Sequence, residues 1–172
     1  MTEYWDIYDE ERTPLQRQHR RGEPLEDGEY HLLVHIWIYN TDGKVLLTQR
    51  HRDISFGSKW ACTGGCVIAG EDSLTAALRE TKEEIGLTIR PEEMMRVSQI
   101  RRLHSFVDTF VVCRDVDDSE ITLQPDEVED FCWVDRKEYK RMEQQKLLHP
   151  ALRDFFREYL PTVRQMRRKK TA

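Results

Sequence analysis

The chain has 172 residues, a formal net charge of −5 and 34% charged residues. Its length suits one domain with a buried core, and its 38% hydrophobic content excludes a wholly disordered chain. The negative charge gives no support for nucleic-acid binding. No apolar run approaches the roughly 18 residues of a membrane helix. The N-terminus, MTEYWDIYDEE, is acidic and unlike a signal peptide. We therefore expect a cytoplasmic protein whose partners include neither membrane nor nucleic acid.

The N-terminal segment, residues 1–28, is predicted to contain one strand and a connecting loop. Tyr4–Tyr8 alternates aromatic and polar residues, which predicts a short strand. Thr13–Asp27 is polar and basic and contains two prolines, which indicates a loop. This loop is either a linker or part of a substrate rim, and the linker is the favoured interpretation. The extra strand and an exposed Trp5 would allow a homodimer.

The strongest strand signal is His31–Tyr39, nine residues without a breaker. One face is aliphatic and the other mixes aromatic and polar side chains, which is typical of a strand in the middle of a sheet. Asn40–Gly43 predicts a hairpin turn, with Lys44–Arg50 returning as the partner strand. The other predicted strands are Trp60–Thr63, which leads into a Gly64-Gly65 turn, and Met95–His104, Phe106–Arg114 and Phe131–Val134.

Three helices are predicted. The first runs from about Asp72 to Ile85, with Asp72 or Ser73 as its N-cap and Gly86 after its last turn. Its predicted buried stripe is Leu74, Leu78, Thr81 and Ile85. The others are Asp135–Gln145 and His149–Tyr159. The fold class is a mixed α/β domain, layered helix–sheet–helix, over residues 29–163, followed by a basic tail, 164–172, that is expected to be disordered.

Three acids on the first helix indicate a metal site. Glu80, Glu83 and Glu84 have the spacing i, i+3, i+4, which places them within an arc of about 100°. Like charges this close repel and destabilise a helix. Divalent cations such as Mg²⁺ and Ca²⁺ prefer oxygen ligands. The arc lies beside the apolar stripe, so the acids are expected at the edge of the packed face.

Four cysteines raise the alternative of a zinc site. Cys62 and Cys66 have the spacing C-x3-C, whereas Cys113 and Cys132 stand alone in apolar runs. Structural zinc sites usually combine two close Cys or His pairs, and the second pair is missing. We expect buried free thiols in a reducing compartment.

The stretch Gly65–Leu87 resembles the Nudix box of Nudix hydrolases. Gly65 is followed after five residues by Glu71 and after seven more by RETKEEIGL. Thr81 is the one departure, because the family usually has an aliphatic residue there. The segments VLLTQR and DEVEDFCWV extend the resemblance to about residues 30–140. It implies a Nudix fold, with a mixed sheet between helices and a loop–helix–loop box.

The implied activity is Mg²⁺- or Mn²⁺-dependent hydrolysis of the pyrophosphate bond in a small molecule, a nucleoside diphosphate linked to another group. The metal ligands implied are Glu80, Glu83 and Glu84, with the Gly65 carbonyl and Glu71 as further candidates. Arg79 is expected to orient a neighbouring carboxylate. The general base comes either from the box or from Glu127, which matches an acid on a later loop in the family. Arg50, Arg52 and Lys59 precede the box and are expected to hold phosphates.

Two alternatives compete with this interpretation. The first 40 residues resemble type 1 isopentenyl-diphosphate isomerases, and His31 matches one of their metal histidines. Gly65 stands where their cysteine is expected, Cys66 is one residue off, and Pro24 and Val67 replace two further metal histidines. A Nudix sensor without turnover usually loses box acids, which are intact here. The sequence does not name the diphosphate that is cleaved.

Overall fold

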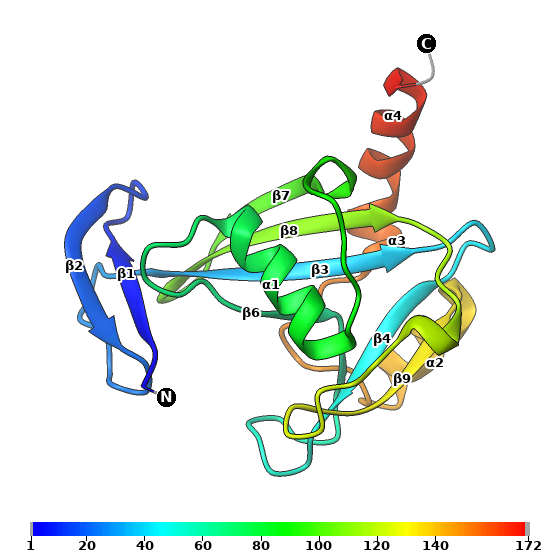
Figure 1. Ribbon diagram of the computed structural model, residues 1–172, viewed down its shortest axis with the longest axis horizontal. Coiled ribbons are helices and arrows are strands. Elements are labelled where there is room, and N and C mark those ends of the chain that lie inside the picture. The colour runs from blue at the N-terminus through cyan, green and yellow to red at the C-terminus, as the bar shows by residue number, and fades with distance from the viewer. Residues whose placement is uncertain (1, 171–172) are drawn as a thin grey trace.

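The computed structural model describes residues 2–170, with side chains for residues 2–166 (Figure 1). The first two strands, β1 (Tyr4–Tyr8) and β2 (Pro14–Arg20), form a separate antiparallel hairpin. The remaining strands form one seven-stranded sheet: β3 (His31–Tyr39), β4 (Val45–Arg50), β5 (Trp60–Ala61), β6 (Thr63–Cys66), β7 (Met95–Arg101), β8 (Ser105–Cys113) and β9 (Val128–Val134). The helices are α1 (Ser73–Ile85), α2 (Arg136–Gln144), α3 (Phe155–Glu158) and α4 (Leu160–Lys170), with short 3-10 turns at Pro91–Glu93 and Asp118–Glu120. None of the described helices is long and apolar enough to cross a membrane.

Strand β3 is the centre of the sheet, as its sequence predicts. It pairs in parallel with β8 over its whole length and antiparallel with β6. Its aliphatic face packs with α1 in one core cluster, whereas Trp37 on the opposite face packs with aromatic residues of α2 and α3 in a second cluster. Two cores on the two faces of one sheet confirm the predicted helix–sheet–helix layering (Figure 1).

The partner of β4 differs from the prediction. The turn at Asn40–Gly43 forms, but β4 pairs with β3 only at Tyr39 and Val45. Strand β6 occupies that edge of β3 instead, and β4 pairs mainly with β9. The predicted Gly64-Gly65 turn is also wrong, because both glycines lie within β6. A Cβ on Gly64 would approach the carbonyl oxygen of Val34 to 2.1 Å, so glycine permits this close pairing.

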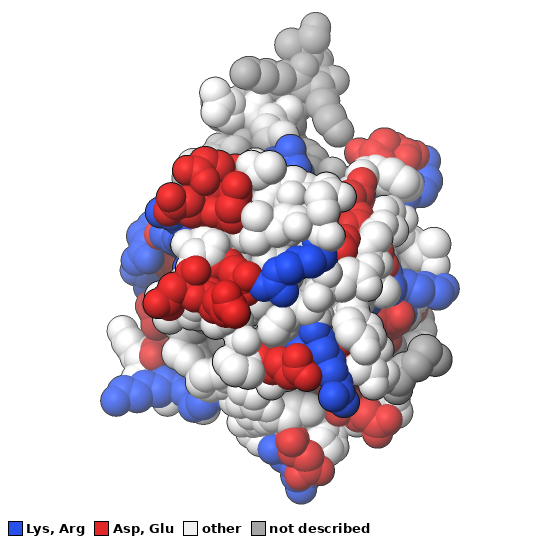
Figure 2. All heavy atoms as spheres, turned by 90° about the vertical axis from the view of Figure 1, so that its left-hand side faces the viewer, with Lys and Arg blue, Asp and Glu red and all other residues white. Residues whose placement is uncertain are grey.

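The N-terminal segment contains a second strand where a loop was predicted. Strand β2 has almost no buried side chains, because only β1 pairs with it. Its sequence therefore lacks the alternation of apolar and polar residues that would predict a strand. Trp5, which was expected to be exposed, is buried and stacks on His31 with ring centroids 4.0 Å apart. On the side of the molecule toward the hairpin, acidic side chains gather in several clusters, some of which have basic side chains beside them (Figure 2). Within the hairpin, Arg21 pairs with Glu3 and Arg20 with Glu23.

The C-terminal segment also departs from the prediction. The predicted helix over His149–Tyr159 is reduced to α3, because Asp154 accepts hydrogen bonds from the N–H groups of Phe156 and Arg157 and so begins the helix there. The basic segment that was expected to be disordered continues as α4 to Lys170, and residues 171–172 lie outside the described part. The helix predicted after Asp135 is confirmed. The assigned domain limits, 1–28, 29–163 and 164–172, remain predictions.

Candidate active site

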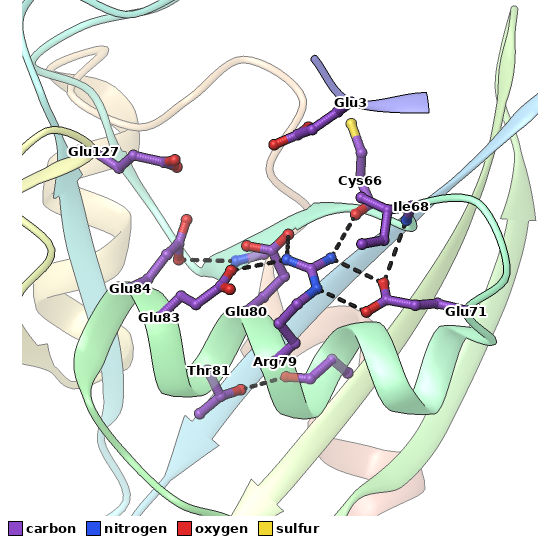
Figure 3. A network of polar contacts seen from close by, with 12 residues as sticks. Glu3, Cys66, Ile68, Glu71, Arg79, Glu80, Thr81, Glu83, Glu84 and Glu127 are labelled. Atoms are coloured by element: carbon purple, nitrogen blue, oxygen red, sulfur yellow. Dashed lines mark hydrogen bonds and ion pairs between the residues drawn. The ribbon is translucent and has the colours of Figure 1, made fainter. Parts of the chain in front are cut away.

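Helix α1 positions the acids, and its ends are set by the predicted caps. Asp72 accepts from the N–H of Thr75 at 2.7 Å, and Gly86 has a φ of 74° with its N–H bonded to the carbonyl of Lys82. The buried face is rotated from the predicted stripe, because Ala76 and Ala77 lie deeper than the two leucines. Thr81 is fully buried, and its hydroxyl donates to the carbonyl of Ala77 at 2.7 Å. This hydrogen bond explains how a threonine replaces the usual aliphatic residue (Figure 3).

The three acids of the box differ in their exposure. Glu80 and Glu84 are 9% and 6% exposed, whereas Glu83 is exposed at the edge of the helix. Glu84 accepts a hydrogen bond from the N–H of Gly64 at 3.1 Å. The Glu80 carboxylate lies against Gly65, where a Cβ would meet its Oε1 at 2.3 Å. Strand β6 therefore has to present glycine to the helix for the two buried carboxylates to fit.

Arg79 connects the acids to one another and to β6 (Figure 3). Its guanidinium donates to Glu71 at 2.8 and 3.0 Å and to Glu80 and Glu83 at 2.9 Å each. A further bond at 3.0 Å reaches the carbonyl of Cys66. Glu71 also accepts from the N–H of Ile68 at 3.3 Å. The orienting role predicted for Arg79 is consistent with these contacts, while Glu71 is engaged by Arg79.

Burial perturbs the ionisation of the two inner acids. It raises the pKa of Glu80 to about 7, against the opposing effect of Arg79. It also raises the pKa of Glu84 well above its ordinary value, the nearby Glu80 adds to this rise, and the N–H of Gly64 partly offsets it. Two adjacent buried carboxylates whose negative charges are not fully compensated destabilise the folded protein. A divalent cation would relieve this cost, so the donor set fits the metal that the Nudix resemblance implies.

Of the three box acids, Arg79 binds Glu80 and Glu83 in the present arrangement. Within the described residues, no group of three or more His, Cys, Asp or Glu side chains is arranged to hold a metal ion. Cys62, Cys66 and Cys132 are free thiols, with Cys62 buried and the other two half-buried, in agreement with the expectation for these three residues. The fit for a divalent cation therefore rests on the oxygen donors and the burial of Glu80 and Glu84.

A cavity of about 230 Å³ lies over these acids. Its lining combines carboxylates, arginines, histidines and cysteines from distant parts of the chain: Arg21, Leu33, Val34, His35, Arg50, Cys62, Gly64, Gly65, Cys66, Glu80, Glu83, Glu84, Glu127 and His149. Glu127 comes from the loop before β9 and faces the same space as Glu84 (Figure 3). The cavity thus gathers the three box acids, Gly65, Glu127 and Arg50 at one place.

Besides Arg79, three predicted residues lie outside this lining. Arg52 donates to Glu129 at 2.7 Å, and its side chain is 73% exposed. The ammonium of Lys59 donates to the carbonyl of Lys146 at 2.6 Å and borders a neighbouring groove. Glu71 is held by Arg79 on the far side of the box. Their predicted roles in binding phosphate or metal gain no geometric support.

Sequence reasoning missed three polar residues of the cavity. Arg21 lies in the segment that was interpreted as a linker, and His149 in one that was predicted to be helical. His35 lies on the mixed aromatic and polar face of β3, and this mixed face was the only local sign that polar residues of the strand could serve a site. Burial lowers the pKa of His35 to about 3 and lowers that of His149, so both rings are neutral near pH 7. His31, the position matched to an isomerase metal histidine, stacks on Trp5 and does not line the cavity.

Comparison with known proteins identifies the family of the chain. A family model described as the NUDIX domain matches residues 29–159. The chain is 34% identical over 142 residues to an uncharacterised Nudix hydrolase from Listeria innocua, covering 81% of this chain and 84% of that protein. A crystal structure of a protein from Deinococcus radiodurans has a TM-score of 0.73 at 19% identity, covering 91% and 99% of the two chains. A MutT/nudix family protein from Enterococcus faecalis has a TM-score of 0.54 at 26% identity, covering 66% and 46%.

The mixed sheet between helices and the loop–helix–loop element with its buried acids define a Nudix fold. The chain belongs to the Nudix hydrolase family. The fold class and the enzyme class predicted from the sequence are confirmed, and membership implies the hydrolysis of nucleoside diphosphate derivatives.

Proposed function

We propose that this protein hydrolyses the pyrophosphate bond of a small nucleoside diphosphate derivative, with Mg²⁺ or Mn²⁺ as its cofactor. One observation carries the proposal: Glu80 and Glu84 are buried beside Gly64 and Gly65 at the wall of a cavity that Glu127 also lines. Buried acids with raised pKa values serve a protein mainly where they bind a cation or transfer a proton.

The residues that would hold the cation are Glu80, Glu83 and Glu84, with the carbonyl of Gly65. When bound, a divalent cation neutralises phosphate charge and lowers the pKa of a coordinated water. Arg79 would keep Glu80 and Glu83 in position through its hydrogen bonds.

Two further side chains of the cavity have distinct roles in this mechanism. Glu127 would accept the proton of the attacking water as general base. Arg50 would hold a phosphate oxygen by a charge-assisted hydrogen bond. Both line the cavity with the box acids, which is the support for these roles.

A substrate panel with Mg²⁺ tests the proposal. Purified protein is incubated with nucleoside di- and triphosphates, nucleotide sugars, dinucleoside polyphosphates and coenzymes, and the products are separated and quantified. We expect one class to be cleaved at its pyrophosphate bond, with activity lost in EDTA. Binding of these compounds without any cleavage would instead support a sensor and would overturn the hydrolase proposal.

Glu83→Gln tests the metal site within that assay. Glu83 is half-exposed, so the fold is expected to survive while kcat falls by several orders of magnitude. Glu92→Gln is the matched control, because Glu92 is also exposed and lies outside the box. Full activity of Glu83→Gln would remove Glu83 from the site.

The isomerase alternative has one observation in its favour, which is that Cys62 and Cys66 line the cavity. Burial raises the pKa of Cys66 to about 11, so its thiol is protonated near pH 7. Incubation with isopentenyl diphosphate, followed by analysis of both the double-bond position and phosphate release, separates the two reactions. Isomerisation that disappears in Cys66→Ala would favour the alternative.

The remaining expectations concern the protein's surroundings. A cytoplasmic location would be tested by cell fractionation. The homodimer would be tested by light scattering of the purified protein, and the burial of Trp5 removes one of the two reasons for expecting it.

A further inference from the structure

The N-terminal hairpin contributes a side chain to the cavity. Arg21 directly follows β2 and lines the same space as the box acids. Its backbone N–H donates to the carbonyl of Glu3 at 3.0 Å, and its Nη1 donates to the carboxylate of Glu3 at 2.5 Å. The guanidinium of Arg21 is therefore held at the rim that the hairpin forms.

The hairpin is fixed to the main domain by specific contacts. Arg12, in the turn between β1 and β2, donates to both oxygens of Asp108 at 2.7 Å, and Asp108 is 1% exposed on β8. Tyr8 and Tyr30 exchange two backbone hydrogen bonds, of 2.8 and 2.9 Å. A bidentate ion pair to a buried carboxylate and a strand bridge hold the hairpin in one position. The position of Arg21 at the cavity follows from this attachment.

The charges of the cavity indicate what Arg21 does there. Four carboxylates line it, from Glu80, Glu83, Glu84 and Glu127, whereas its cationic side chains are Arg21 and Arg50. The Nε of Arg50 is occupied by the carbonyl of Ser55 at 2.9 Å. Arginine has five N–H donors, and the bond to Glu3 engages only one nitrogen of Arg21. A polyanionic substrate needs such a cation to approach a wall of carboxylates.

We infer that Arg21 is a substrate-binding residue, which holds a phosphate of the diphosphate from the side of the N-terminal hairpin. The inference rests on the proposed function, because it takes the substrate to be a diphosphate. It makes the hairpin part of the site, and it assigns Glu3 as the positioning residue that orients the Arg21 guanidinium.

The test is binding of methylenediphosphonate, a diphosphate analogue whose bridge cannot be hydrolysed, to the full-length protein with Mg²⁺ by calorimetry. We expect Arg21→Ala to raise the Kd about tenfold or more, and Arg21→Lys to give an intermediate value, because lysine keeps the charge without the planar fork. In turnover assays, Arg21→Ala should raise KM more than it lowers kcat. The thermal midpoint of each variant shows whether the fold is intact.

Arg20→Ala is the matched control. Arg20 is the neighbouring arginine, it pairs with Glu23 at 3.8 Å on the surface, and it does not line the cavity. Its Kd should stay within about twofold of the wild type. Equal Kd values for Arg21→Ala and the wild type would overturn the inference while leaving hydrolysis intact. A wild-type protein that neither binds the analogue nor cleaves any diphosphate would overturn both the inference and the proposed function.

Discussion

The carboxylate of Glu80 lies so close to Gly65 that a Cβ at position 65 would come within 2.3 Å of its Oε1. Gly65→Ala would therefore displace Glu80 from the site. We expect kcat/KM to fall at least tenfold and the free energy of unfolding to fall by about 1–3 kcal/mol. Activity assays and denaturant unfolding measure the two effects.

Gly70→Ala is the control for this change. Gly70 has a φ of 85° and open space around its Cβ position, so alanine there costs backbone strain of about 1 kcal/mol but meets no atom. Its activity should be preserved. If Gly65→Ala keeps full activity, the close contact between Gly65 and Glu80 has no functional role.

A second prediction concerns the pH dependence of the metal-free protein. Folding raises the pKa of Glu80 from an ordinary 4.5 to about 7, so the folded state binds more protons than the unfolded state between these values. This group therefore destabilises the protein as pH rises from about 4.5 to 7. Glu80→Gln, which stays neutral, should gain stability over the wild type across that window, by on the order of 1–3 kcal/mol.

The measurement is the difference in thermal stability between Glu80→Gln and the wild type, in EDTA, at several pH values. The difference is needed because His31 and His35, whose pKa values are lowered by burial, act in the opposite direction. Mg²⁺ affinity of the wild type should rise through the same window, because the cation competes with the proton on Glu80. A stability difference that does not change with pH would contradict the raised pKa.

The role of Glu127 is testable apart from the metal. Glu127→Gln should lower kcat by about 10²- to 10⁴-fold if it is the general base, with Mg²⁺ affinity changed less than about threefold. Asp126→Asn is the control, because Asp126 is exposed and does not line the cavity. An unchanged kcat would place the general base within the box instead.

The attachment of the hairpin gives a stability prediction. Burial pushes the pKa of Asp108 upward, but hydrogen bonds from Arg12, Ser73 and Gln99 outweigh it, so the net pKa is lowered. Arg12→Ala would remove the bidentate partner of a buried carboxylate and leave it the longer ion pair with Arg96 at 3.8 Å, and we expect a loss of about 3 kcal/mol in the free energy of unfolding. KM should also rise, since the hairpin carries Arg21.

Denaturant unfolding measures this loss, with Arg20→Ala expected to cost less than about 0.5 kcal/mol as an exposed pair. The double variant Arg12→Met with Asp108→Leu should recover most of the stability, because an apolar pair avoids the unpaired charge. A double variant as unstable as Arg12→Ala would show that the charge of Asp108 is not the cause.

The sequence by itself determined the elements whose signals are local. Each of these signals lies within one or two helical turns or within one strand. They are the i, i+3, i+4 spacing of Glu80, Glu83 and Glu84, the caps at Asp72 and Gly86, and the unbroken apolar run of β3. These local patterns carried the Nudix resemblance, the layered fold and the expectation of a metal site.

Only the tertiary structure decided which distant residues complete the cavity. Arg21 directly follows a polar strand that has no apolar face, and His149 lies in the irregular segment before Asp154 and α3, so neither residue has a local signal. Arg52 and Lys59 are near the box in sequence, but their side chains bind Glu129 and the carbonyl of Lys146 and do not line the cavity. Contacts between segments far apart in the chain depend on how the sheet and the hairpin pack, and no periodic pattern in the sequence predicts that packing.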